Sequence, residues 1–205
     1  MKKDPDPGVI LGWAAVLVLL VDILVNFGDW TELLWFCTIT TALLAYALFR
    51  KNALVMTLCL IMSVPAQILW VVDFFLYMAG HGMGRTELLA HCGPLIFWGS
   101  LVIHTFVIPV SFWGVRRLGF HPRALGWAVL YGAAILLASY YTTPPFKNVN
   151  CVFFSCDGLD PGGGYWAHFW VETFFQSLGV AVVSFFIFRF LFRGGLVKEV
   201  HAEHA

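Results

Sequence analysis

Six long apolar runs, separated by short polar or Gly- and Pro-containing segments, dominate the chain. They cover residues 9–27, 31–49, 53–79, 94–115, 124–142 and 166–191. Each run is close to or above the roughly 20 residues that a helix needs to cross a bilayer. The runs are continuous instead of alternating, which argues against a β-barrel. The pattern predicts an all-α polytopic membrane bundle of six transmembrane helices, forming a single integral membrane domain over residues 1–205.

The composition supports a membrane location. Apolar residues make up 60% of the 205 positions and charged residues only 12%, whereas a soluble domain carries about 25% charged residues. The twelve basic and twelve acidic residues cancel, so there is no electrostatic case for a nucleic-acid partner. The expected partner is a membrane lipid substrate, and six helices are few enough that the chain could also form a homo-oligomer.

The basic residues predict the orientation, because cytoplasmic loops carry an excess of Lys and Arg. If the spans alternate, one side carries Lys2, Lys3, Arg50, Lys51, Arg116, Arg117, Arg123, Arg189, Arg193 and Lys198, and the other carries Arg85 and Lys147. Both termini are therefore expected in the cytoplasm, in a bacterial inner membrane or a eukaryotic endomembrane. Residues 143–165 then form an outer cap loop, in which Cys151 and Cys156 could form a disulfide if that side is oxidising.

Ionisable residues inside the apolar runs are costly and therefore mark candidate functional positions. Asp22, Asp73, His104 and Glu172 lie in four different runs. At a rise of ~1.5 Å per residue, all four fall roughly 8 to 15 Å below the outer boundary. Gln176 follows Glu172 by one turn, and Tyr140 lies at the outer end of the fifth run. The shared depth predicts a cavity that opens toward the outer leaflet.

This layer also contains candidate nucleophiles. The second run, in WFCTITTALL, places Cys37 beside Thr38, and the fourth run, in LVIHTFVIP, contains the buried His104. A Thr or Cys nucleophile needs a base within hydrogen-bond reach, and His is the usual one. Neighbouring helix positions point about 100° apart, so one of Cys37 and Thr38 faces His104. Asp22, Asp73 or Glu172 could orient the imidazole as a third member. No metal or cofactor is predicted.

Two stretches resemble known membrane enzymes. The second run with its basic turn, and the fourth run with H-T-F-V-I-P followed by a basic turn and an aromatic fifth run, resemble the family of androgen-induced gene 1 and androgen-dependent TFPI-regulating protein. Those proteins hydrolyse fatty-acid esters of hydroxy fatty acids with an intramembrane Thr and His. The resemblance covers roughly residues 30–150 and implies Thr38 as nucleophile and His104 as base.

A second resemblance overlaps the first. LLWFCTITTALLAYALFRKN is similar to the second span of the YwaF-like group, whose human member is described as a phospholipid acyltransferase that uses a Cys acyl intermediate and a His. The stretch from Tyr140 to Asn150, which ends in NVN, is also similar to that group. This resemblance implies Cys37 as the nucleophile, although Trp35 stands where the pattern often has His.

The sequence thus predicts an intramembrane lipid hydrolase or acyl-transfer enzyme that acts on fatty-acid esters. The alternative is a small proton- or cation-coupled transporter or channel that uses the buried carboxylates. Pro65 and Pro109 interrupt the third and fourth runs, and broken helices mark many transporters. No internal repeat of the kind common in transporters is present.

Overall fold

The computed structural model describes residues 6–82, 84–153 and 164–195, and these are helical with no β-strand. Four helices are long and apolar enough to cross a membrane. They are α1 (Pro7–Val25), α3 (Ala53–Met78), α5 (Pro94–Leu118) and α6 (Ala124–Thr142). The expected all-α fold is confirmed, and the described residues contain four candidate membrane spans by length and composition. The count of six spans and the side of the termini stay predictions.

The other two apolar runs are divided. The second consists of a short 3₁₀ helix η1 (Trp30–Leu34) and helix α2 (Phe36–Arg50). The last consists of α7 (Gly164–His168), the π-helical segment η4 (Phe169–Phe174) and α8 (Phe175–Leu191). The division in the second run lies at Trp35, which has extended backbone angles (φ −64°, ψ 138°). At ~1.5 Å per residue, the 15 residues of α2 extend only about 22 Å.

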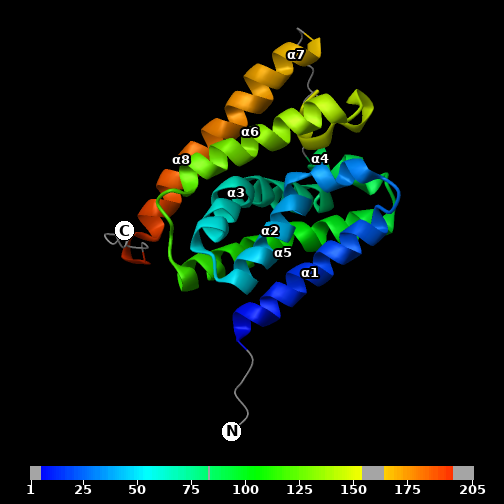
Figure 1. Ribbon diagram of the computed structural model, residues 1–205. Coiled ribbons are helices and arrows are strands. Elements are labelled where there is room, and N and C mark those ends of the chain that lie inside the picture. Colours follow the sequence, from blue (N-terminus) through cyan, green and yellow to red (C-terminus); the bar gives the residue numbers. More distant parts are fainter. Residues whose placement is uncertain (1–5, 83, 154–163, 196–205) are drawn as a thin grey trace.

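The helices form two groups around α3. Helix α1 packs on α2 and α5, both of which also pack on α3, while α6 and α8 lie side by side against α3 (Figure 1). A buried cluster centred on Leu44, Met56, Leu60 and Phe120 joins the groups. Figure 1 also shows that α1 begins and α8 ends at the same end of the bundle.

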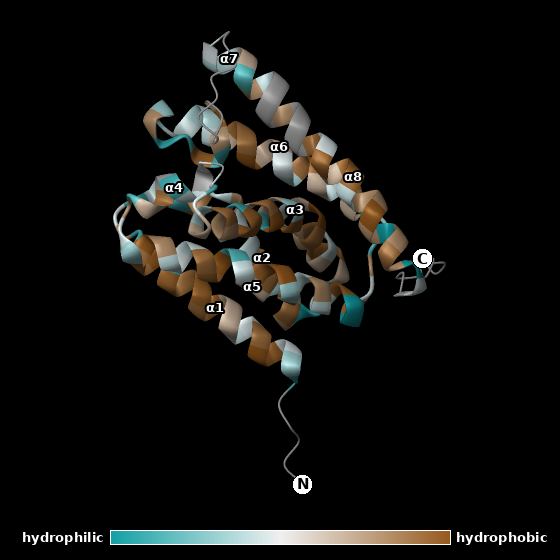
Figure 2. Ribbon diagram, turned by 180° about the vertical axis from the view of Figure 1, so that it is seen from behind, coloured by the Kyte–Doolittle hydropathy of each residue, from teal (hydrophilic) through white to brown (hydrophobic). Residues whose placement is uncertain are grey.

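Short segments close the opposite end. Helix α4 (Arg85–Ala90) connects α3 to α5, and two 3₁₀ turns, η2 (Pro145–Lys147) and η3 (Val149–Cys151), follow α6. At the other end, η5 (Arg193–Gly195) follows α8. Hydrophobic positions dominate the long helices, and hydrophilic positions gather at helix ends and in the connecting segments (Figure 2). This distribution is the one expected if lipid covers the sides of the bundle and water its ends.

Helices α3 and α5 approach closely at a glycine. A Cβ atom added to Gly114 would lie 2.4 Å from Sδ of Met56, whose side chain is fully buried. We therefore expect Gly114→Ala to destabilise the protein by about 1 to 3 kcal/mol, because the added methyl overpacks the contact. The unfolding midpoint of the detergent-solubilised protein, followed by intrinsic fluorescence, measures this effect.

Gly126→Ala is the matched control, since a Cβ at this α6 position meets nothing within 4 Å. Ala is favoured over Gly in a helix by roughly 0.5–1 kcal/mol, so this variant should be as stable as wild type or slightly more so. Equal midpoints for the two variants would contradict the close approach of α3 and α5.

Candidate functional site

A hydrogen bond joins the end of α1 to the start of α2 and forms the centre of the candidate site. Thr38 Oγ1 donates to Asp22 Oδ2 at 2.8 Å. Asn26, at the C-terminus of α1, donates through Nδ2 to Asp22 Oδ1 at 3.1 Å. A hydroxyl, a carboxylate and an amide therefore form one chain, and each is within hydrogen-bond reach of the next.

A pocket of about 210 Å³ lies against these hydrogen-bonded side chains. Its lining comes from the end of α1, from η1 and from the turn between them: Asp22, Ile23, Asn26, Phe27, Gly28, Asp29, Trp30, Glu32 and Leu33. Phe27 and Trp30 are exposed, at 86% and 56%. Thr38 is only 5% exposed and does not line the pocket. Asp22 therefore lies between the pocket and the Thr38 hydroxyl.

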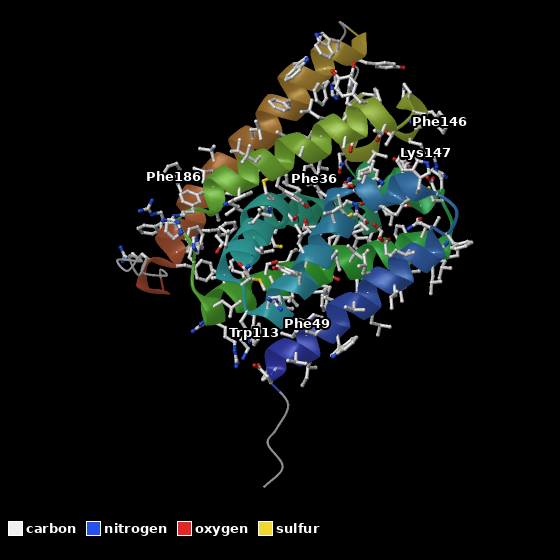
Figure 3. All side chains as sticks on the ribbon, in the orientation of Figure 1. Phe36, Phe49, Trp113, Phe146, Lys147 and Phe186 are labelled. Carbon is white, nitrogen blue, oxygen red and sulfur yellow. The ribbon has the colours of Figure 1, made fainter. Side chains whose placement is uncertain are left out.

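The pocket has an acidic edge that an ion pair partly neutralises. Asp29 accepts from the Thr31 hydroxyl and forms an ion pair with Lys147, which lies beside Phe146 on η2 (Figure 3). The hydrogen bond from Lys147 lowers the pKa of Asp29, with a further contribution from Thr31. Glu32 is the second acid on the lining of this edge.

The start of α2 is capped by a residue 114 positions away in sequence. Trp35 provides no side-chain cap, but Asn150 Oδ1 accepts the Phe36 N–H at 2.9 Å. Asn150 Nδ2 donates to the Leu34 carbonyl at 2.7 Å and to Ser139 Oγ at 2.9 Å. Asn150 therefore fixes the break between η1 and α2 at Trp35, three residues before Thr38, and ties it to α6.

His104 has different partners from those predicted. Its Nδ1 lies 2.7 Å from the Ser100 carbonyl, and its ring stacks on Trp70 with centroids 4.1 Å apart. Among the described residues, the Thr38 hydroxyl is hydrogen-bonded to Asp22 and not to His104. The pocket is likewise lined by Asp22 but not by His104. The structure brings together Asp22 and Thr38, and it gives His104 a separate aromatic environment.

The other polar groups of α2 do not contact a carboxylate through their side chains. Thr41 Oγ1 bonds to the Cys37 carbonyl at 2.8 Å, and Thr40 Oγ1 bonds to Ser63. Cys37 is a free, partly exposed cysteine. Within the described part of α2, Thr38 is thus the hydroxyl that is paired with an acidic side chain.

The remaining predicted residues have other surroundings. Asp73 is buried and accepts from both the backbone N–H and the hydroxyl of Thr86 at 2.7 Å, which fastens α4 to α3. Tyr140 lies in an aromatic cluster with Phe153 and Phe169. The pocket that Asp22 lines includes neither Asp73 nor His104.

Three predicted residues cannot be placed in this site. The side chains of Glu172 and Gln176 lie outside the described part of the structure, as does Cys156. Cys151 is in a disulfide, and its pairing with Cys156 stays a prediction. Sequence reasoning missed Asn26 and the role of Asn150. Asn150 stood in the NVN stretch, but nothing in its spacing pointed to the start of α2 as its partner.

The Asp29–Lys147 ion pair should make a small, pH-dependent contribution to stability. The pKa of Asp29 is lowered from its ordinary value of 3.8 and that of Lys147 is raised from 10.5. The stabilisation is therefore complete between these two values, and is lost as pH falls through the folded pKa of Asp29 or rises through that of Lys147. Because both side chains are partly exposed, we expect Asp29→Asn to cost about 1 kcal/mol or less at pH 7.

Unfolding midpoints of wild type and Asp29→Asn, measured from pH 7 down to pH 3, test this contribution. The difference should shrink as the carboxylate of wild type becomes protonated. A difference that stays constant to pH 3 would show that the charge of Asp29 is not what stabilises the contact.

Removing the Asn150 side chain should destabilise the start of α2. Asn150 has a positive φ of 55°, so Asn150→Gly removes the three hydrogen bonds without adding backbone strain. At about 1 kcal/mol per bond, the expected loss is roughly 2–3 kcal/mol. Asn52→Ala, which removes a local cap on Val55 N–H, is the control and should cost only about 1 kcal/mol. Equal losses would contradict a special role for Asn150.

The described residues contain no group of three or more His, Cys, Asp or Glu side chains arranged to hold a metal ion. The groups that the structure places at the site are the Thr38 hydroxyl, the Asp22 carboxylate and the Asn26 amide, with the pocket beside them. Comparison with protein-family models, curated proteins and solved structures finds no match to this chain.

Proposed function

We propose that the protein is an intramembrane lipid hydrolase or acyl-transfer enzyme in which Thr38 is the nucleophile and Asp22 the general base. The observation that carries the proposal is the 2.8 Å hydrogen bond from Thr38 Oγ1 to Asp22 Oδ2 beside the pocket. An activated hydroxyl has a base within hydrogen-bond reach, and a third group that orients this base. Asn26 is the orienting group, since it donates to the other oxygen of Asp22.

The reaction proceeds in two balanced steps. Thr38 Oγ attacks the carbonyl carbon of the ester while its proton passes to Asp22 Oδ2, and the C–O bond to the alcohol then breaks as that alcohol takes the proton from Asp22. Water, or the hydroxyl of a second lipid, next attacks the acyl-threonine and gives its proton to Asp22. The proton returns to Thr38 when the acyl–oxygen bond breaks, which regenerates the resting site.

The surroundings of the pocket favour a lipid ester as substrate. Phe27 and Trp30 on its lining are exposed, as is Leu24 on the preceding turn. If six helices span the membrane and both termini are cytoplasmic, this end of the bundle lies near the outer headgroups. Ester carbonyls lie at that level, and the acyl chains would continue along the apolar helices. Two neighbouring acids, Asp29 and Glu32, give the pocket a polar edge for the headgroup.

In this mechanism Asp22 takes the part that the sequence predicts for His104. Thr38 is almost fully buried behind Asp22, so the ester must reach it through a local displacement of the Asn26 side chain while Asp22 stays bonded to Thr38. The mechanism does not require His104, whose ring stacks on Trp70.

Substitution at the pair should abolish hydrolysis. Thr38→Ala removes the nucleophile and Asp22→Asn removes the base, and we expect each to lower the rate by at least about 100-fold, the lower end of the range for general-base catalysis. The rate of fatty-acid release from a long-chain fluorogenic ester in mixed micelles measures the effect. Labelling of the purified protein by a fluorophosphonate probe provides a second readout.

Thr41→Ala is the matched control, because Thr41 is one turn from Thr38 and bonds only to a backbone carbonyl of its own helix. It should hydrolyse the ester at close to the wild-type rate. His104→Ala separates the two mechanisms, since it should retain activity if Asp22 is the base. Full activity in folded Thr38→Ala would overturn the proposal, whereas loss in His104→Ala with retention in Asp22→Asn would restore His104 as the base.

A proton-coupled transporter is the second candidate, and one observation favours it. Among the described residues, the hydrogen-bond partners of Asp22 are neutral groups, Thr38 and Asn26. A membrane carboxylate without a cationic partner is suited to exchange a proton. Transport would be favoured if the interior of proteoliposomes acidifies under a proton gradient with wild type and with Thr38→Ala, but not with Asp22→Asn. The protein should then show no ester hydrolysis.

A further inference from the structure

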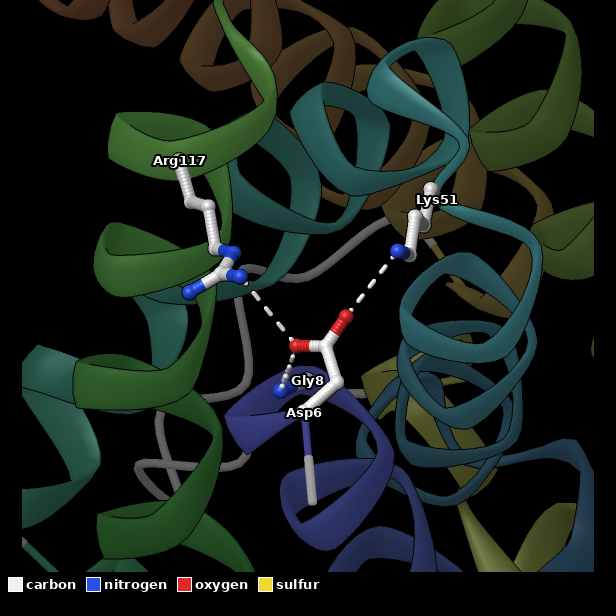
Figure 4. A network of polar contacts seen from close by, with 4 residues as sticks. All are labelled: Asp6, Gly8, Lys51 and Arg117. Carbon is white, nitrogen blue, oxygen red and sulfur yellow. Dashed lines mark hydrogen bonds and ion pairs between the residues drawn. The ribbon is translucent and has the colours of Figure 1, made fainter. Parts of the chain in front are cut away.

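Three donors from three helices converge on one carboxylate at the end of the bundle where α1 begins. Asp6 precedes α1 and accepts the Gly8 N–H at 2.9 Å. Its other contacts are the Lys51 ammonium at 2.9 Å and the Arg117 guanidinium at 3.2 Å (Figure 4). Lys51 follows α2 and Arg117 lies in the last turn of α5. Two cations and a helix N-terminus directed at one anion are the elements of an oxyanion-binding site.

Both basic residues have structural features that do not involve Asp6. Lys51 ends α2 in a left-handed conformation (φ 50°). The Arg117 guanidinium lies over the ring of Trp113, 5.4 Å from its centroid, an arrangement stabilised by cation–π attraction. The contact with Trp113 would hold the Arg117 guanidinium in place if the Asp6 carboxylate moved away.

Two further basic residues lie next to these cations in the sequence. Arg50 and Arg116, the sequence neighbours of the two cations, are exposed and form no ion pair in the described part of the chain. The Asp6 contact is itself open to the surface, since the side chains of Lys51, Arg117 and Asp6 are 65%, 48% and 25% exposed. One carboxylate thus pairs with two cations at a position that an external anion can reach.

The location selects a lipid over a soluble anion. The three helix ends lie where long apolar helices terminate, which is the level of phospholipid headgroups. Phe49 and Trp113 lie beside the start of α1 (Figure 3). Farther along α1, Trp13 and Leu17 are exposed and offer an apolar surface for acyl chains. A phosphodiester at Lys51 and Arg117 would satisfy the same donors that Asp6 now satisfies.

We propose that Lys51 and Arg117 form a binding site for the phosphate of an anionic phospholipid, and that Asp6 occupies this site as an internal competitor when no such lipid is bound. The lipid carries one negative charge at the phosphate, as Asp6 does at its carboxylate. Its affinity is therefore set by the competition between the two anions. This site is separate from the pocket at the other end of α1 and does not depend on the reaction proposed there.

Binding of a fluorescent phosphatidylglycerol to the full-length protein in dodecyl maltoside tests the proposal, with the matching phosphatidylcholine as the zwitterionic reference. Wild type should prefer phosphatidylglycerol. Lys51→Gln and Arg117→Gln should each weaken its binding about fivefold, the effect expected for one basic residue at an anionic lipid surface. Arg117→Lys should retain most of the affinity, which separates loss of charge from loss of fold.

Asp6→Asn is the variant that distinguishes competition from simple attraction. Asn caps a helix as well as Asp does, so the Gly8 contact survives while the negative charge is removed. Its affinity for phosphatidylglycerol should rise several-fold. Arg189→Gln is the matched control, because Arg189 is also exposed and lies over an aromatic ring, that of Phe185, and its loss should leave binding within about twofold of wild type.

Four outcomes would overturn the proposal or its competitor. The first is equal binding of the two lipids by wild type, and the second is a phosphatidylglycerol affinity that is the same in Lys51→Gln, Arg117→Gln and Arg189→Gln. The third is displacement of the lipid by inorganic phosphate at equal concentration, which would assign the site to a soluble anion. An affinity of Asp6→Asn at or below that of wild type would remove Asp6 as the competitor.

Discussion

The backbone N–H and carbonyl groups at the start of α2 need hydrogen-bond partners that apolar surroundings do not provide. The structure around the candidate site depends on the side chain that supplies these hydrogen bonds. Trp35 interrupts the second apolar run, leaving the Phe36 N–H and the Leu34 carbonyl without helical partners. Such groups are costly in a membrane unless they are bonded internally. Asn150 bonds both and reaches Ser139 as well, so one side chain fixes α2, η1 and α6 relative to one another.

Helix α1 is held in a different way. Its buried residues are the small Gly8, Gly12 and Ala15, and the rest of its surface is largely exposed apolar side chains. Polar contacts fasten it at both ends: the Asp6 cluster where it begins, and the bonds from Asn26 and Thr38 to Asp22 near its end. Small residues allow close packing without a large apolar contact, so these polar contacts fix the position of α1 along its neighbours.

The two constraints meet at Asp22 and Thr38. Asn150 sets where α2 begins and therefore where Thr38 lies, while the contacts of α1 set the position of Asp22. The ion pair of Lys147 with Asp29 joins the same loop that carries Asn150 to the turn after α1. The loop after α6 thus supports the pocket from two sides, which gives it a positional role in any chemistry that the site performs.

The sequence determined the all-helical class and its candidate membrane spans, because an uninterrupted apolar run of about 20 residues has few other stable arrangements. It also determined that Asp22, Thr38 and His104 lie inside apolar segments. Depth along a helix does not specify which way a side chain points or which helices are neighbours. Only the tertiary structure therefore decided that Thr38 bonds to Asp22, that His104 stacks on Trp70, and that Asn150 caps a helix 114 positions earlier. These contacts depend on helix rotation and on long-range pairing, which periodicity does not encode.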